Sequence, residues 1–385
     1  MLIHFRRILL LILLFCSGAQ LVAQPGRPMT QYNFQLETKV HYGFFAQHHF
    51  EMETFNSHFP GFELILQRST FGSQRWEILY DYPLVGLAAW YSPMGNIPEI
   101  GASFALFPFI NFPLNIEPTQ NLYFRTGVGL AYLSNKFEAR ENFRNFAIGS
   151  TLNVAISLNF DYRYRISEYA TITATLGLTH FSNGSMKTPN YGINIPTVSV
   201  GFSTYLRKPN HYLDRMLLPE LYIFEFGEEK NIISIEPTIA FGTKDMTEQL
   251  EERFMVYHLS LNVLKPVSFK TKIGIGLDAT YDFSHPRILE QKGAEYSSNL
   301  TILKPGLTAI YEMVMMKTSF MFQLGGHLSG AEQSSGAIYQ KIGLKHYLYE
   351  KLFGSITLTA HFGKADYIGF GLGYRFDIEH KKSKK

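Results

Sequence analysis

One short segment of the sequence combines a hydroxyl and an imidazole at a spacing that could support nucleophilic catalysis. His180 and Ser182 are two residues apart, and Asn194 follows after a loop. An imidazole can take the proton of a serine hydroxyl and activate a weak nucleophile, and a third polar group can orient the ring. A His-x-Ser pair alone is a weak signal, so its meaning depends on where the surrounding chain places it.

The residues around this pair alternate with the period of a β-strand. In residues 171–182 one face is small and hydroxylic, and the other is apolar until it ends in His180 and Ser182. The segment after the loop repeats the arrangement, with Asn194 in line with the apolar positions at its near end. Residues at i and i+2 share a face of a strand. We therefore expect the three polar side chains to gather on the apolar side of two neighbouring strands.

The rest of the chain is built from similar alternating segments, separated by polar residues or by Gly, Pro and Asn. They are longer than the ~5–6 residues of soluble strands and suit a tilted membrane crossing, which needs ~9–11. Apolar residues make up 46% and aromatic residues 15% of the chain. These features predict an all-β, antiparallel transmembrane β-barrel of about 16 strands in one enlarged barrel, with two consecutive eight-stranded barrels as the alternative.

The N-terminal residues 1–23 are typical of a secretory signal peptide. Two arginines precede an unbroken apolar run from Ile8 to Phe15, and small residues follow. Cys16 is the only cysteine, so the expected mature chain has no thiol for a disulfide, a nucleophile or a metal site. Removal of the segment leaves 33 basic and 32 acidic residues, which gives no electrostatic basis for binding nucleic acid.

The mature chain divides into two expected portions. Residues 30–208 contain the candidate site, and residues 218–380 add further barrel strands or a second barrel. Residues 75–91 and 218–228 are among the expected strands. If the first strand starts in the periplasm, the strand that ends at Ser182 runs outward, and the longer connections lie at the same extracellular end.

The motif H-F-S-N, which begins at His180, and the motif P-N-Y-G, which ends at Gly192, resemble the signature of a known family. This is the lipid A 3-O-deacylase (PagL) or acyloxyacyl hydrolase family of outer-membrane barrels. The resemblance covers roughly residues 36–207. The site residues that it implies are the catalytic residues Ser182, His180 and Asn194 and the oxyanion or positioning residues Asn190, Asn183 and Gly192.

The implied roles follow the family's motif position by position. Ser182 corresponds to the nucleophile, His180 to its base and Asn190 to a donor that helps to stabilise the oxyanion. Asn194 is a departure, because the family has a glutamate at the matching position. An amide can orient an imidazole, but it cannot stabilise an imidazolium as a carboxylate does.

The resemblance implies an outer-membrane serine esterase that hydrolyses an ester-linked acyl chain of lipid A, the anchor of lipopolysaccharide. Its partner is then the lipid of the bacterial outer membrane, and no cofactor or metal is expected. The alternative is a non-catalytic outer-membrane barrel, either a pore or a structural or lipid-binding protein, that retains the motif as a relic. A weaker echo of the motif at His327 and Ser329 is interpreted as structural.

Overall fold

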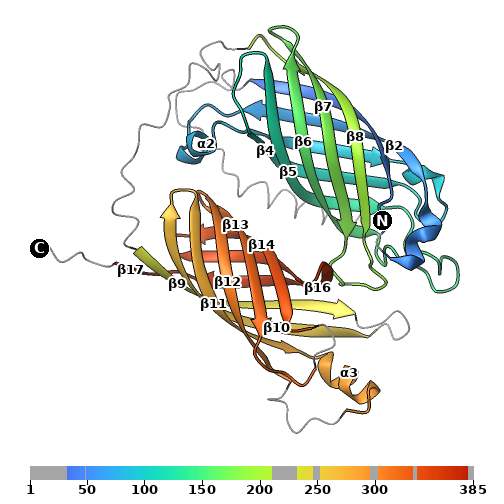
Figure 1. Cartoon of the computed structure of the whole chain (residues 1–385), viewed down its shortest axis with the longest axis vertical. Coiled ribbons are helices and arrows are strands. Elements are labelled where there is room, and N and C mark those ends of the chain that lie inside the picture. Colours follow the sequence, from blue (N-terminus) through green and yellow to red (C-terminus); the bar gives the residue numbers. More distant parts are fainter. Residues whose placement is uncertain are drawn as a thin grey trace, which may run out of the picture.

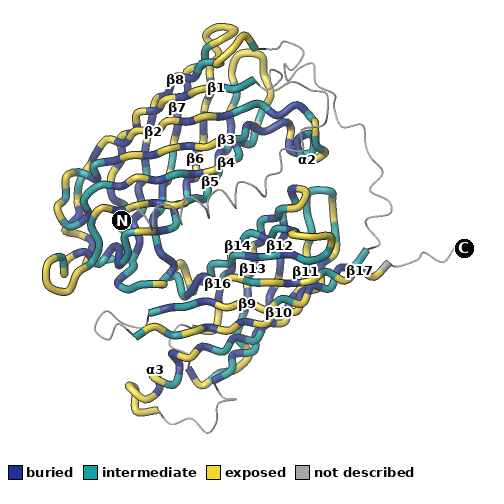
Figure 2. Tube along the Cα trace, turned by 180° about the vertical axis from the view of Figure 1, so that it is seen from behind, coloured by how far each residue is buried: buried dark blue, intermediate teal, exposed yellow. Residues whose placement is uncertain are grey.

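The chain forms two β-barrels that lie next to one another (Figures 1 and 2). The predicted signal peptide 1–23 and the predicted strand 218–228 lie outside the described residues. The structure is a computed structural model, and the residues that it describes are 33–47, 49–209, 232–245, 252–294, 302–332 and 336–379.

Both barrels are built from consecutive antiparallel strands. The first consists of β1 (Phe34–Phe44), β2 (His58–Ser69), β3 (Leu84–Ser92), β4 (Ser103–Pro113), β5 (Gln120–Leu133), β6 (Leu152–Arg165), β7 (Ala170–Ser182) and β8 (Ile193–Tyr205). The second consists of β9 (Ile232–Asp245), β10 (Arg253–Ser268), β11 (Thr271–Asp282), β12 (Lys304–Met315), β13 (Thr318–His327), β14 (Ile338–Tyr349), β15 (Leu352–His361) and β16 (Lys364–Tyr374). The short β17 (Phe376–Glu379) continues along β9.

The strand pairings close each barrel separately. In the first barrel β1 pairs with both β2 and β8, and in the second β9 pairs with both β10 and β16. The predicted all-β antiparallel barrel fold is therefore confirmed, in the form of the two-barrel alternative. The single enlarged barrel was wrong because β1 and β8 satisfy each other's edges, so neither has a free edge for further strands.

The predicted strand 75–91 was wrong in its first part. Residues Arg75–Leu79 form the short helix α2, and the strand begins only at Leu84. The Glu77 carboxylate accepts the backbone N–H groups of Gly72 and Ser73, each at 2.9 Å, and so ties the connection into a compact loop. The other short helices are η2 (Phe50–Phe55), η3 (Met94–Asn96) and α3 (His285–Gln291).

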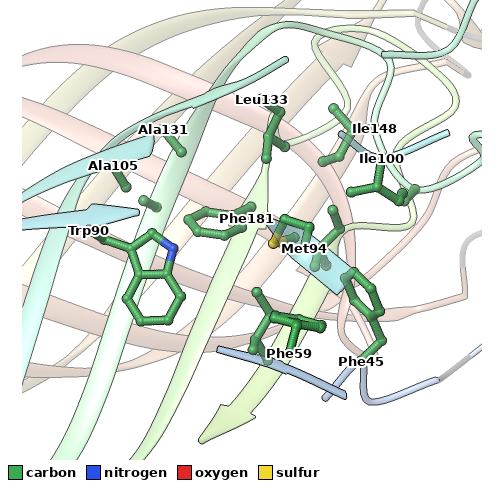
Figure 3. Packing of buried hydrophobic residues seen from close by; sticks show 14 of the residues in the cluster. Phe45, Phe59, Trp90, Met94, Ile100, Ala105, Ala131, Leu133, Ile148 and Phe181 are labelled. Carbon is green, nitrogen blue, oxygen red and sulfur yellow. The ribbon is translucent and has the colours of Figure 1, made fainter. Parts of the chain in front are cut away.

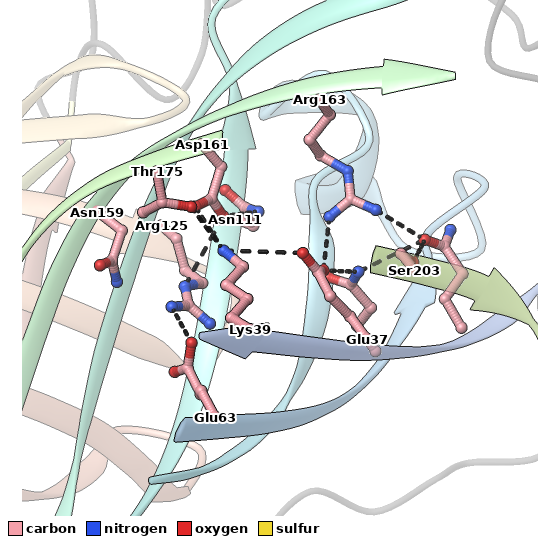
Figure 4. A network of polar contacts seen from close by, with 12 residues as sticks. Glu37, Lys39, Glu63, Asn111, Arg125, Asn159, Asp161, Arg163, Thr175 and Ser203 are labelled. Atoms are coloured by element: carbon pink, nitrogen blue, oxygen red, sulfur yellow. Dashed lines mark hydrogen bonds and ion pairs between the residues drawn. The ribbon is translucent and has the colours of Figure 1, made fainter. Parts of the chain in front are cut away.

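The lumen of the first barrel contains a network of buried ion pairs (Figure 4). Lys39 Nζ lies 2.7 Å from Asp161 Oδ1, and Arg125 Nη2 lies 2.8 Å from Glu63 Oε2. Arg163 Nη1 lies 2.9 Å from Glu37 Oε2. An eight-stranded barrel has just enough interior for its own side chains. These polar groups therefore fill the lumen instead of lining a channel.

The part of the same lumen near the end of β7 is apolar (Figure 3). Phe181 is fully buried among inward-facing side chains that include Phe59, Met94 and Leu133. Phe181 lies between His180 and Ser182 in the chain, so its packing holds the end of β7 against the barrel interior. The apolar cluster thus fixes the strand whose opposite face carries the candidate site.

The outer wall of both barrels is apolar. Leu176, Val200, Ile239 and Leu277 are each more than half exposed, at 64%, 64%, 58% and 56%. Exposed aliphatic residues on this scale require an apolar surrounding. Among the described residues, the helices are all too short or too polar to span a bilayer.

Removing one arginine from the lumen network should destabilise the first barrel. Arg125→Met leaves the buried Glu63 carboxylate without its closest cation, so we expect a loss of about 3–5 kcal/mol in the free energy of unfolding. Urea titration followed by tryptophan emission measures this, since both tryptophans of the chain, Trp76 and Trp90, belong to the first barrel. The control is Arg140→Met in an exposed loop. A loss for Arg125→Met no larger than for this control would contradict the structural role of the network.

Candidate active site

Two neighbouring strands, β7 and β8, bring the predicted polar residues together. His180 and Asn194 are direct partners in the register between these strands. Along β7 the odd positions Thr173, Thr175, Thr179 and Phe181 are buried in the lumen, so His180 and Ser182 face outward. The predicted outward orientation of His180 and Ser182 is therefore confirmed. They lie at the end of the outer face of β7, which carries exposed apolar side chains.

The His180 ring is held by the amide of Asn194. Asn194 Oδ1 lies 2.6 Å from His180 Nδ1. Because an amide oxygen only accepts hydrogen bonds, Nδ1 carries the proton and Nε2 keeps its lone pair. This is the tautomer that a general base needs.

The Ser182 hydroxyl receives two N–H donors. Asn190 Nδ2 donates to Ser182 Oγ at 2.8 Å, and the backbone N–H of Gly184 donates to the same oxygen at 3.2 Å. The Asn190 amide is oriented by a second bond, because its Oδ1 accepts the backbone N–H of Asn183 at 3.1 Å. Two donors thus converge on the hydroxyl from the loop that follows β7.

Two further predicted residues shape the loop without donating a side chain to Ser182. The buried Asn183 amide donates to Ser150 Oγ and to the carbonyl of Lys187, each at 2.9 Å. Gly192 has a φ of 79°, and a Cβ there would lie 2.9 Å from His180 Cε1. Glycine is therefore required where the backbone passes close to the imidazole ring.

The β5–β6 connection is hydrogen-bonded to the β7–β8 loop. The backbone N–H groups of Tyr191 and Gly192 donate to the carbonyls of Phe146 and Ala147, at 3.2 and 2.9 Å. The Tyr191 ring also stacks on His49, with ring centroids 4.2 Å apart. These contacts join loops that are distant in sequence.

Neither the contact of Gly184 with Ser182 nor the residues that support the loop were predicted from the sequence. Asn183 and Gly184 form an Asn-Gly dipeptide, a known turn signal, so the sharp turn after Ser182 was detectable. The long-range partners Ser150 and Ala147 were not, because they lie in another connection.

The echo motif in the second barrel has a different orientation. His327 continues the inward-facing side of β13, and its ring lies 4.4 Å from that of Tyr339. This placement inside the barrel agrees with the structural interpretation of His327. In the described part of the chain, no group of three or more His, Cys, Asp or Glu residues could hold a metal ion.

The two halves of the chain match two family descriptions. Residues 60–203 match "Lipid A 3-O-deacylase (PagL)", and residues 233–379 match "Acyloxyacyl hydrolase, C-terminal domain". Each match covers most of one barrel, and the first includes the whole β7–β8 site. The chain belongs to the PagL family. It is therefore a protein of the bacterial outer membrane.

Several solved structures are similar to the chain. The outer membrane enzyme PagL is 15% identical and covers 43% of this chain and 97% of its own, with a TM-score of 0.30. Neisserial surface protein A is 9% identical and covers 45% and 97%, with a TM-score of 0.31. OccAB4 of Acinetobacter baumannii is 9% identical and covers 91% and 100%, with a TM-score of 0.24. No curated protein matches the chain.

A methyl group at Gly192 should disturb His180 without unfolding the barrel. In Gly192→Ala the new Cβ meets the imidazole, so we expect Ser182 to react with an alkyl phosphonate about tenfold more slowly, within the ~10²-fold range of a 1 Å misplacement. Peptide mass spectrometry of the labelled protein measures the rate. Gly293→Ala is the control, because Gly293 has a φ of 64° and no neighbour within 4 Å. Equal labelling of the two variants would show that Gly192 does not constrain the ring.

Proposed function

We propose that this PagL-family protein is a serine esterase that removes an ester-linked acyl chain from lipid A, with Ser182 as the nucleophile and His180 as its base. The observation that carries the proposal is the pair of contacts described above, His180 with Asn194 and Ser182 with Asn190, on one outward-facing patch. A nucleophile that faces the leaflet suits a scissile bond that belongs to a membrane lipid.

The reaction would begin with attack of Ser182 Oγ on the ester carbonyl while the hydroxyl proton passes to His180 Nε2. The carbonyl oxygen becomes an oxyanion bonded to the same carbon as Oγ, so the N–H groups of Asn190 and Gly184 are near enough to donate to it. Collapse of this intermediate breaks the ester bond, and His180 returns the proton to the departing sugar hydroxyl. Water activated by His180 then hydrolyses the acyl-serine and releases the fatty acid.

Asn194 would serve as the orienting member of this group. Its amide oxygen fixes the proton on His180 Nδ1, which leaves Nε2 available to the hydroxyl. A neutral amide does not offset the positive charge that His180 acquires during attack. The proposed enzyme therefore keeps the geometry of a triad and gives up the charge stabilisation of an acid.

The filled lumens argue against the pore alternative. In the second barrel Lys345 Nζ lies 2.8 Å from Glu236 Oε2 and 2.7 Å from Glu312 Oε2. Lys341 Nζ lies 2.6 Å from Asp278 Oδ2. Like the network of the first barrel, these pairs occupy the centre of a narrow barrel. A conducting path would have to displace them.

The direct test of the function compares lipid A from cells that express different variants. We expect wild-type protein to remove an acyl chain and Ser182→Ala to leave the lipid A mass unchanged, because the nucleophile is lost. Mass spectrometry of extracted lipid A measures this. The control is Ser199→Ala, which removes a buried serine that faces the lumen on β8. Full deacylation by Ser182→Ala, or none by the wild type, would refute the proposal.

Substitution of Asn194 should show how much kcat is lost because an amide, and not a carboxylate, lies beside His180. Asn194→Glu places a carboxylate beside His180 and should raise kcat about tenfold at neutral pH, a fraction of the ~10⁴-fold effect of an acid in serine proteases. Asn194→Leu should lower kcat. Equal rates for the leucine variant and the wild type would exclude an orienting role for Asn194.

A further inference from the structure

We infer that the second barrel positions the oxyanion donors of the first, by holding the β7–β8 loop on its outer wall. This inference rests on the proposed function and assigns a role in it to β9 and β16, which the site residues alone do not include. Figure 1 shows the β7–β8 loop reaching toward β16.

Two hydrogen bonds join the loop to the second barrel at Ser185. Ser185 Oγ donates to the carbonyl of Ala365 on β16 at 2.7 Å. The backbone N–H of Asp245, the last residue of β9, donates to the carbonyl of Ser185 at 3.1 Å. The hydroxyl and the backbone carbonyl of Ser185 are therefore both hydrogen-bonded to strands of the second barrel.

The neighbouring Gly184 packs directly against the same wall. A Cβ at Gly184 would lie 2.5 Å from Ile368 Cγ1 and 2.6 Å from its Cδ1. The outward-facing Phe370, Leu372 and Tyr374 further along β16 are 43%, 49% and 42% exposed, whereas Ile368 is only 8% exposed. The loop of the first barrel therefore covers the apolar surface of the second at this point.

The residue that packs against Ile368 is also the one that donates to the proposed nucleophile, Ser182. The N–H of Gly184 is the group that donates to Ser182 Oγ at 3.2 Å. Gly184 and Ser185 have φ values of 62° and 63°, a left-handed conformation that is unfavourable for serine. The bonds from Ala365 and Asp245 offset this strain, so the second barrel stabilises the loop shape that aims the N–H at the hydroxyl.

A second set of contacts fixes the barrels at their opposite ends. The Tyr80 hydroxyl, in the β2–β3 connection, lies 3.0 Å from the carbonyl of Val314 and 3.3 Å from that of Lys270. The Arg75 guanidinium lies 3.9 Å above the ring of Phe269. Contacts at both ends restrain the second barrel from pivoting away from the loop.

Ile368→Ala tests the positioning role without changing any residue of the proposed catalytic group. The substitution leaves a space beside Gly184, so we expect faster hydrogen exchange of the amides in residues 183–192. We also expect kcat to fall about tenfold, within the ~10²-fold range of a small misplacement, with KM and the pH–rate profile unchanged. The pH profile separates this role from damage to the His180–Asn194 pair, which the substitution does not touch.

The matched control is Ile275→Ala, an equivalent change on the outer wall at β11, where Ile275 is 62% exposed. Ser185→Ala, which removes the bond to Ala365, is a second variant if Ile368→Ala fails to fold, and it should also speed loop exchange. Exchange in residues 183–192 equal to that of the control would overturn the inference, whether or not the protein is active. A wild type that does not deacylate lipid A would instead overturn the proposed function.

Discussion

An eight-stranded barrel is just wide enough inside for its own side chains, and this limit decides where chemistry can occur in the protein. The lumen of the first barrel is occupied by ion pairs in one part and by an apolar cluster around Phe181 in the other. A reactive group therefore reaches a substrate only from the outer wall or from a loop. In the proposed site His180 and Ser182 lie on the outer wall at the end of β7, and Asn190 comes from the loop.

The same period-two pattern that builds the barrel also places the site. Each inward residue of β7 packs in the lumen, so each even-numbered residue must face outward, including His180 and Ser182. The register between β7 and β8 then sets Asn194 directly opposite His180. Alternation along two strands, read from the sequence, was enough to predict this juxtaposition.

The parts that the sequence did not predict depend on long-range geometry. Alternation does not specify which strand pairs with β1, so the choice between one barrel and two was settled only by the β1–β8 pairing. The helix α2 replaced the start of a predicted strand because the side chain of Glu77 caps backbone groups of its own loop. Gly184 packs against Ile368, which is far away in sequence. Local patterns carry no information about such partners.

The central claim is that Ser182 forms a covalent bond to the acyl group of a lipid. The most direct measurement is peptide mass spectrometry of wild-type protein mixed with lipid A in vesicles and quenched with acid within the first turnover. The account predicts a fatty acyl group on the peptide that contains Ser182, bound to that serine. An acyl group on another residue, or released fatty acid without any acylated protein, would contradict it.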